Sequence, residues 1–195
     1  MRMILGAALL ATTAVASPAF AQSAAGPFAG PRVEGIVGYD NAKIPGPNSD
    51  GVVYGGGIGY DIQSGGTVYG VEAELSDSTV DECSPNVIVA GDTLCGQIGR
   101  DIYVGARAGA VVGANTLLYA KAGYVNGRVQ LDYDDGTAAN TTGYETGRNL
   151  DGVRVGAGVE HAIGPNSYIK AEYRYSNYEQ DIEKHQAVAG FGFRF

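Results

Sequence analysis

The sequence predicts an all-β protein, an eight-stranded antiparallel up-and-down β-barrel that crosses a membrane with its strands. Three observations favour this fold. Apolar residues alternate with charged residues or glycines at a period of two along several segments, as they do in strands with two different faces. Short and long connections alternate between these segments along the chain. The last segment, Ala187–Phe195, places its large apolar side chains on a single face.

In each predicted strand, most residues at every second position are apolar and form one face, whereas most residues between them are polar or glycine and form the other face. We call these two sets of alternate positions the two parities of the strand. In chain order the strands are Phe28–Tyr39, Val52–Ile62, Thr67–Ser78, Gly99–Val112, Leu117–Gln130, Gly152–Ala162, Ser167–Tyr178 and Ala187–Phe195. Representative apolar residues, in the same order, are Val37, Ile58, Val71, Val104, Leu118, Val155, Ile169 and Phe193. Residues on the opposite parity are Glu34, Gly57, Glu72, Arg107, Lys121, Arg154, Lys170 and Arg194. The apolar parities would face lipid and the others the barrel interior.

The connections alternate in length, which independently supports the barrel. Three short ones, at Gln63–Gly66, Gly113–Asn115 and Gly164–Asn166, contain the Gly, Asn and Pro residues of tight hairpin turns. The longer ones are Asp40–Gly51, Thr79–Ile98, Leu131–Asp151 and Glu179–Lys184. Outer-membrane barrels place short turns in the periplasm and long loops outside. An even number of strands then brings both ends of the barrel to the periplasmic side.

The C-terminal strand combines membrane compatibility with a sorting pattern. In water its aromatic face would favour aggregation, whereas lipid solvates it. Gly190, Phe193 and Phe195 resemble the C-terminal signal of bacterial outer-membrane β-barrels, which the barrel-assembly machinery recognises. We expect aromatic girdles at the two membrane interfaces from Tyr39, Tyr60, Tyr69, Tyr124, Tyr173, Tyr175, Phe191, Phe193 and Phe195.

The N-terminal segment predicts export. Arg2 precedes an apolar stretch, Met3–Ala16, that is too short for a transmembrane helix. A helix-breaking Pro18 and small residues follow, so we expect a Sec signal peptide at residues 1–21, cleaved between Ala21 and Gln22, and a barrel domain at 22–195. A retained membrane anchor is the alternative, and no lipobox cysteine follows to support it.

Composition excludes other classes. Gly occurs 31 times and Tyr 13 times, Trp is absent, and mean hydropathy is −0.05. Beyond the signal peptide no run reaches the ~18 apolar residues of a spanning helix, and alternating strands average out in hydropathy. The net charge of −8 would repel nucleic-acid phosphates, so no nucleic-acid partner is expected.

Three segments carry a family resemblance: Leu118–Tyr124, Val153–Glu160 and Ile169–Tyr175. They resemble the opacity-like and porin-family barrels of proteobacteria and are similar to the membrane domain of the OmpA class. The resemblance implies the bacterial outer membrane, contact with its lipid and lipopolysaccharide, and a role in envelope integrity or in adhesion to an unknown surface ligand. A narrow porin-like channel for small solutes or ions is the alternative. No cofactor is implied, and because nothing follows Phe195 we expect no cell-wall tether.

The interior parity carries a balanced set of charges, five acids against six bases. They are Arg32, Glu34, Glu72, Glu74, Arg107, Lys121, Arg154, Glu160, Lys170, Glu172 and Arg174. The lumen of an eight-stranded barrel is just wide enough for side chains to fill. Buried charges must pair, because an unpaired one costs several kcal/mol. The same residues suit a salt-bridged plug or a gated narrow channel, and the sequence does not separate the two.

Cys83 and Cys95 lie in the second long loop, and two cysteines in an exported chain predict one disulfide. In the chain-entropy model the closed loop is stabilised by about 3 kcal/mol. A metal site is not expected because no histidine lies near, and no Cys-x-x-Cys motif indicates redox catalysis.

The long loops are rich in Asp and Glu. This pattern is typical of a solvated surface, and divalent-cation bridging to lipopolysaccharide phosphates is the alternative. The segment Asp132–Gly136 lacks the spacing of an EF-hand loop, so no metal ligands are assigned.

An enzyme is not expected. Outer-membrane enzymes use a histidine at the external rim; His161 lies beside a predicted periplasmic turn, and His185 lacks an accompanying nucleophile motif. No catalytic residue is therefore assigned.

Overall fold

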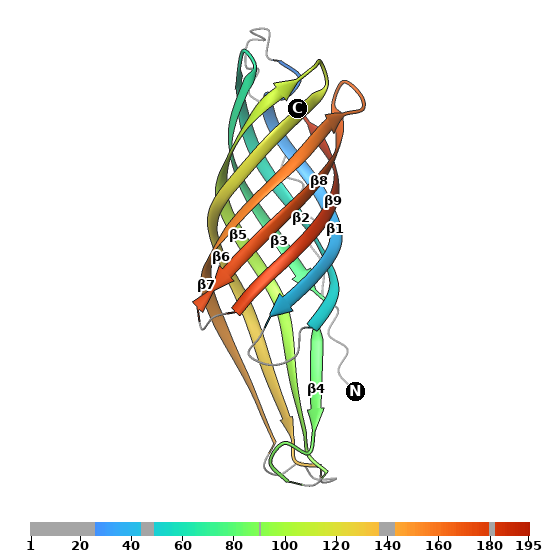
Figure 1. Cartoon of the computed structure of the whole chain (residues 1–195), viewed down its shortest axis with the longest axis vertical. Helices are drawn as coiled ribbons and strands as arrows, with labels where there is room; N and C mark the ends of the chain where they lie inside the picture. Colours follow the sequence, from blue (N-terminus) through green and yellow to red (C-terminus); the bar gives the residue numbers. More distant parts are fainter. Residues whose placement is uncertain (1–25, 44–48, 90, 137–142, 180–181) are drawn as a thin grey trace, which may run out of the picture.

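The computed structural model describes residues 26–43, 49–89, 91–136, 143–179 and 182–195 (Figure 1). The predicted signal peptide, with its cleavage between Ala21 and Gln22, lies outside the described residues. The strands are β1 Gly30–Lys43, β2 Ser49–Ser64, β3 Thr67–Ser78, β4 Asp81–Pro85, β5 Thr93–Val112, β6 Thr116–Asp134, β7 Tyr144–Ala162, β8 Ser167–Tyr178 and β9 Ile182–Arg194. Among the described residues no helix is long and apolar enough to cross a membrane.

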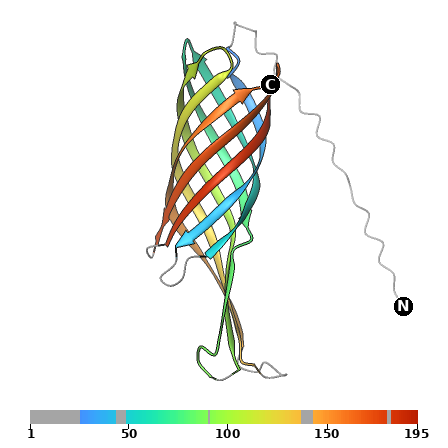
Figure 2. The same ribbon diagram turned by 45° about the vertical axis from the view of Figure 1, so that its right-hand side comes forward.

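Eight of these strands close into an antiparallel barrel, which confirms the predicted fold. Successive strands pair as hairpins, and the β3–β5 and β1–β9 pairings complete the ring. The closing seam pairs Val33 with Phe193 and Tyr39 with Ala187, so the C-terminal strand meets the first strand as its pattern requires. Figures 1 and 2 show the strands tilted around a common axis. We call the end with the short turns and Phe195 the turn end, and the opposite end the loop end.

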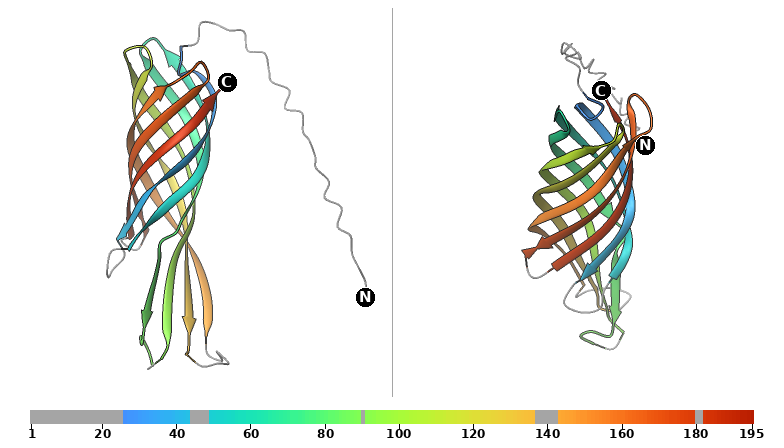
Figure 3. Two further views of the ribbon diagram at one scale, coloured as in Figure 1. Left: turned by 90° about the vertical axis from the view of Figure 1, so that its right-hand side faces the viewer. Right: turned by 45° about the horizontal axis from the view of Figure 1, so that its top comes forward.

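A four-stranded extension projects beyond the loop end, and the sequence did not predict it. β5, β6 and β7 are 20, 19 and 19 residues long, whereas β3 and β8 have 12 each. β4 pairs with the distal part of β5, and the β6–β7 ladder runs to Tyr133–Tyr144. Figure 3 shows these strands standing clear of the barrel. We call residues 81–98, 129–136 and 143–148 the extension.

The prediction of Thr79–Ile98 and Leu131–Asp151 as loops was therefore wrong over most of both ranges. These segments are rich in Asp, Gly and Thr, and their apolar alternation is weak. Strand formation there depends on ladder hydrogen bonds to a neighbouring strand, which local sequence patterns do not encode.

The outer face of the barrel is apolar. Ile58, Val71 and Val153 each leave more than 60% of their area exposed, which suits contact with lipid rather than water. Exposed aromatic rings gather near both ends. They are Tyr60, Tyr69, Phe191, Phe193 and Phe195 toward the turn end, and Tyr39, Tyr54, Tyr124 and Tyr173 toward the loop end. Tyr175, expected among them, is half-buried with its ring 5.0 Å from the His185 ring.

Apolar clusters narrow the lumen toward each end. Phe28 precedes β1, instead of opening the first strand as predicted, and packs with Val68, Leu117 and Tyr119 near the turn end. Its backbone NH donates to Gln63 Oε1 at 3.0 Å, which fixes it inside the barrel. Toward the loop end a second cluster is formed by Tyr103, Val125, Leu150 and Tyr178. Charged side chains fill the space between the clusters.

Candidate functional site

The structure places all eleven predicted lumen residues in the barrel interior. Five further charged residues join them: Asp40, Asp61, Asp101, Lys184 and Arg194, the last of which the alternation had already placed on the interior face. All sixteen are at most 7% exposed, and they comprise eight acids and eight bases. Asp61 continues the glycine parity of β2, so the same alternation rule could have located it. Asp40 and Lys184 lie at strand positions that sequence analysis had assigned to loops.

Nearest the turn end, Asp61 is surrounded by three arginines. Its carboxylate accepts from Arg32 Nε at 3.1 Å, from Arg107 Nη2 at 2.6 Å and from Arg194 Nη1 at 3.0 Å. Glu160 accepts from the same Arg107 and Arg194 at 3.0 and 2.6 Å. The arginines thus bridge two acids on different strands, which ties β1, β2, β5, β7 and β9 together.

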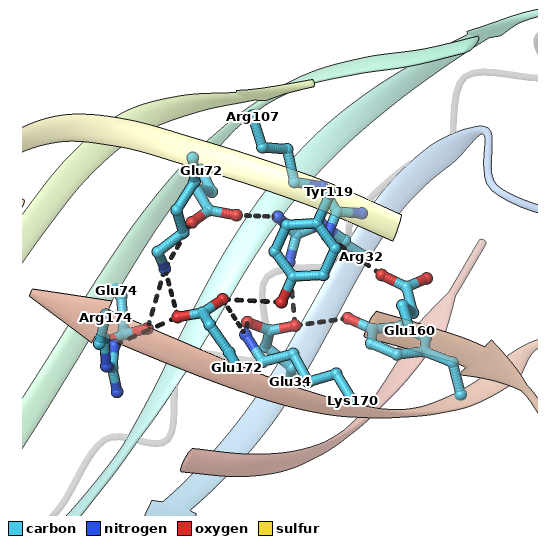
Figure 4. A network of polar contacts seen from close by, with 12 residues as sticks. Arg32, Glu34, Glu72, Glu74, Arg107, Tyr119, Glu160, Lys170, Glu172 and Arg174 are labelled. Carbon is cyan, nitrogen blue, oxygen red and sulfur yellow. Dashed lines mark hydrogen bonds and ion pairs between the residues drawn. The ribbon is translucent and has the colours of Figure 1, made fainter. Parts of the chain in front are cut away.

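The middle of the lumen is a mixed network of lysines and glutamates (Figure 4). Lys170 Nζ lies 2.5 Å from Glu34, and Lys121 Nζ lies 2.8 Å from Glu72 and 3.0 Å from Glu172. Two buried tyrosines donate further hydrogen bonds to these carboxylates. Tyr168 donates to Glu34 and Tyr119 donates to Glu172, each at 2.7 Å. Sequence analysis did not assign tyrosines to the lumen network, although their inward parity was readable.

Toward the loop end the pairing continues without interruption. Arg174 pairs with Glu74, and Arg154 lies 2.9 Å from Asp101. Lys184 bridges Asp101 and Asp40 at 3.0 and 3.2 Å. Each of the sixteen buried charges therefore has an opposite partner within 4.0 Å, which is what the cost of an unpaired buried charge demands.

A disulfide joins the first two strands of the extension. Cys83 of β4 and Cys95 of β5 occupy directly paired positions of the ladder and form the predicted bond. The bond spans a sequence separation of 12 residues and encloses the β4–β5 connection. It fixes the two strands at the distal end of the extension, far from the barrel.

The β4–β5 connection folds around one buried carboxylate, that of Asp92. This carboxylate accepts from the backbone NH groups of Val87, Ile88 and Val89 at 2.7, 2.8 and 3.0 Å. The Tyr133 hydroxyl of β6 donates to it at 3.0 Å. Burial alone would raise the pKa of Asp92, and these donors outweigh it and lower the pKa. The sequence pattern indicated only that the long loops are acidic, and it gave no sign that one of these acids is buried.

The same connection presents three apolar side chains to the outside. Val87, Ile88 and Val89 are 48%, 66% and 52% exposed although their backbone NH groups are all hydrogen-bonded. We call these three residues the apolar tip. The connection after β6 packs against its base: a Cβ at Gly136 would lie 2.2 Å from the Gly91 carbonyl oxygen, and the φ of Gly136 is +72°. Glycine is therefore required where the two connections meet.

The two histidines lie at opposite ends of the barrel, and the Nε2 atom of His185 lies 4.0 Å from Glu183 Oε2. His185 Nδ1 lies 2.7 Å from the Tyr173 hydroxyl, and His161 Nδ1 lies 3.0 Å from Thr116 Oγ1 at the turn end. In the part of the chain that the structure describes, no cluster of three or more His, Cys, Asp or Glu side chains could hold a metal ion.

Gly190 and Phe193 of the predicted assembly signal lie on opposite faces of β9, and Phe195 directly follows this strand. Phe193 and Phe195 are exposed on the outer face. Gly190 faces inward, where an added Cβ would lie 2.9 Å from Lys170 Cε. A glycine at position 190 thus makes room for Lys170 in the lumen. This structural requirement for glycine is independent of any role in sorting.

Comparison with known proteins agrees with this architecture. The family model for the outer membrane protein β-barrel domain matches residues 7–195. The 22 kDa outer membrane protein of Rhizobium leguminosarum bv. viciae is 33% identical over 138 residues, covering 67% of this chain and 56% of that protein. The chain thus matches little more than half the length of this relative.

Two solved structures show the same fold at low identity. Ail, the attachment invasion locus protein of Yersinia pestis, solved with the heparin analogue sucrose octasulfate, has a TM-score of 0.56 at 19% identity, covering 85% of this chain and 99% of Ail. Neisserial surface protein A has a TM-score of 0.58 at 16% identity, covering 85% of this chain and 97% of that protein.

Proposed function

The chain belongs to the outer membrane protein β-barrel domain family and is a protein of the bacterial outer membrane; from this premise we propose that it is a closed surface barrel that displays the extension for adhesion or envelope integrity. By the usual orientation of such barrels the loop end faces outside. The observation that carries the proposal is the contrast between a filled lumen and a projecting, locally hydrogen-bonded tip.

The lumen supports a closed barrel over a channel. The ion pairs extend from Arg194 near the turn end to Lys184 near the loop end, and apolar clusters lie at both ends of this series. Opening a path for ions would require breaking several pairs at once, each costly in a low-dielectric interior. A narrow channel for small solutes or ions remains the alternative function.

Conductance of the purified, refolded chain in a planar bilayer separates these functions. We expect no steady single-channel steps. Regular steps that are altered by Asp61→Asn, a substitution inside the lumen, would replace the closed-barrel proposal with the channel.

The apolar tip supports a surface-interaction role. Bacterial cells expressing the protein should adhere to octyl-coated beads, and a triple substitution of Val87, Ile88 and Val89 to Ser should lower adherence roughly fivefold, since a few central apolar residues dominate most interfaces. Ile163→Ser is the matched control, because Ile163 is equally exposed but lies at the turn end. Equal adherence of the triple variant and the parent would contradict a role of the tip.

The remaining expectations are part of the same proposal. The partners are outer-membrane lipid, lipopolysaccharide and, through Gly190, Phe193 and Phe195, the barrel-assembly machinery; no nucleic acid is involved. Phe195→Ala should reduce the amount of folded barrel in the outer membrane. The protein is proposed not to be an enzyme, so His185→Ala should leave the lipid A profile unchanged by mass spectrometry.

A further inference from the structure

We infer that Arg100 and Arg128 form a binding site for phosphate groups of lipopolysaccharide on the outside of the barrel, at the base of the extension. Both arginines line a cleft of about 610 Å³ between the end of β3 and strands β5 and β6. The other lining residues include Asp77, Thr79, Gln97 and Gln130. The site gives the proposed lipopolysaccharide contact a definite position, and it does not depend on adhesion or on a closed lumen.

The strand pattern places this cleft on the membrane-facing side. Along β6, Lys121, Val125 and Gly127 are buried, whereas Tyr124 and Arg128 on the other parity are exposed. Arg128 therefore continues the outer face on which Tyr124 belongs to the loop-end girdle. It lies four residues beyond that tyrosine, which for a tilted strand is roughly 10 Å farther along the barrel axis. The rings of such a girdle sit at head-group level, so Arg128 lies just beyond that level, where the phosphorylated sugars of the outer leaflet project from the membrane.

A β-bulge brings the second arginine to the same place. The β5–β6 register shifts between Ile98 and Asp101, so Gly99 and Arg100 lie where the ladder is interrupted. Asp101 points into the lumen, and Arg100 is exposed in the cleft beside Arg128. Bulges commonly re-aim a side chain next to a functional site.

The two arginines differ from the lumen arginines in their pairing. Among the described residues neither forms an ion pair, although every lumen arginine does. The Asp77 carboxylate in the cleft accepts the backbone NH of Ser78, and it leaves the cleft with an excess of one positive charge. This local excess is opposite in sign to the net charge of the whole chain, which is −8.

Phosphate is the ligand that these donors fit. The guanidinium fork can donate two parallel hydrogen bonds to phosphate oxygens, and the Gln97 and Gln130 amides add neutral donors. A neighbouring cleft, whose lining includes Arg128, Gln130, Asp132 and Thr146, extends the polar surface along the extension, where Asp132 can accept hydrogen bonds from saccharide hydroxyls. Lipopolysaccharide presents phosphate on a sugar at this height in the same leaflet, so it is the source that position favours over a soluble anion.

The test measures lipopolysaccharide binding to the full chain refolded in detergent micelles, with EDTA present to exclude metal bridging. We expect the double variant R100Q/R128Q to bind phosphorylated lipopolysaccharide at least tenfold more weakly than the parent. Phosphatase-treated lipopolysaccharide should bind the parent and the double variant equally. The matched control is R148Q, because Arg148 is an exposed arginine of β7 that lines neither cleft; its affinity should stay within about twofold of the parent.

Three outcomes would overturn the inference. They are equal affinity of the parent and the double variant, equal affinity of the parent for both lipopolysaccharide forms, and binding of sucrose octasulfate with the same arginine dependence while lipopolysaccharide binding is unchanged. The last would identify a soluble sulfated sugar as the ligand. If the double variant lacks the heat-modifiable folded band, R128Q alone provides the comparison, with an expected threefold loss. The proposed function is tested by separate measurements of conductance and bead adherence. A negative result in either of them would not change the interpretation of the lipopolysaccharide-binding test.

Discussion

The lumen and the extension are each organised around a buried aspartate with several donors, but the donors differ in kind. Asp61 in the lumen is held by three arginines, the most distant 133 residues away in sequence. Asp92 in the extension is held by backbone NH groups three to five residues away and by one tyrosine. The lumen thus couples the whole barrel, whereas the tip is fixed locally and can open without unfolding the strands beneath it.

The first way to test this difference is to neutralise Asp61. Asp61→Asn removes the carboxylate that faces Arg32, Arg107 and Arg194, and leaves those cations under-compensated in a buried site. We expect the free energy of unfolding of the entire barrel to fall by about 3–5 kcal/mol. Urea unfolding in micelles, followed by tyrosine fluorescence since the chain contains no tryptophan, measures the change.

The control for this substitution is Glu179→Gln, at an exposed position beyond β8. It removes one negative charge in the same way, and its effect should stay within about 0.5 kcal/mol because surface charges contribute little. If both variants unfold alike, the lumen network does not couple the barrel.

The two regions also differ in how far the sequence predicts them. The period of two located the barrel strands and most of the sixteen lumen charges, because a lipid-facing side of a strand forces the opposite side inward. The alternation with a period of two no longer applies where the strands leave the lipid. In the extension both faces of the sheet meet water, so Asp, Thr and Gly occur on either parity and resemble loop residues.

The pairing of the lumen charges was not predictable either. Which base meets Asp61 depends on barrel closure and strand stagger, since Arg194 reaches it from the other end of the chain. The Asp92 arrangement was hidden for a different reason: its donors are backbone groups, which every sequence has.

The second test acts on the extension alone. Replacing both Cys83 and Cys95 with Ser removes the cross-link between β4 and β5, and the extension should lose about 3 kcal/mol of local stability in the chain-entropy model. Hydrogen exchange of the amides of residues 81–98 should accelerate accordingly, while the barrel melts at an unchanged temperature. A parallel fall in the melting temperature of the barrel would show that the two regions unfold together.

The smallest and most local effect is the response of the apolar tip to pH. The pKa of Asp92 lies below its ordinary value of 3.8, because donors from Val87, Ile88, Val89 and Tyr133 outweigh burial, so its ionised form stabilises the folded connection. That stabilisation is present above the ordinary value and is lost as pH falls through the lowered pKa. Protease cleavage within residues 86–92, after brief exposure to each pH, should therefore stay constant at mildly acidic pH and rise only in stronger acid.

Asp92→Asn should abolish this pH dependence. The amide oxygen can still accept a hydrogen bond, but without the charge it holds the three NH groups less firmly, so cleavage at neutral pH should increase roughly tenfold through local opening. Asp132→Asn, at an exposed position of β6, should keep the parent's pH profile. A profile that persists in Asp92→Asn would mean that another group controls the tip. Loss of folded barrel in the same variant would mean that the tip is not an independent unit, and the contrast with Asp61 would then fail.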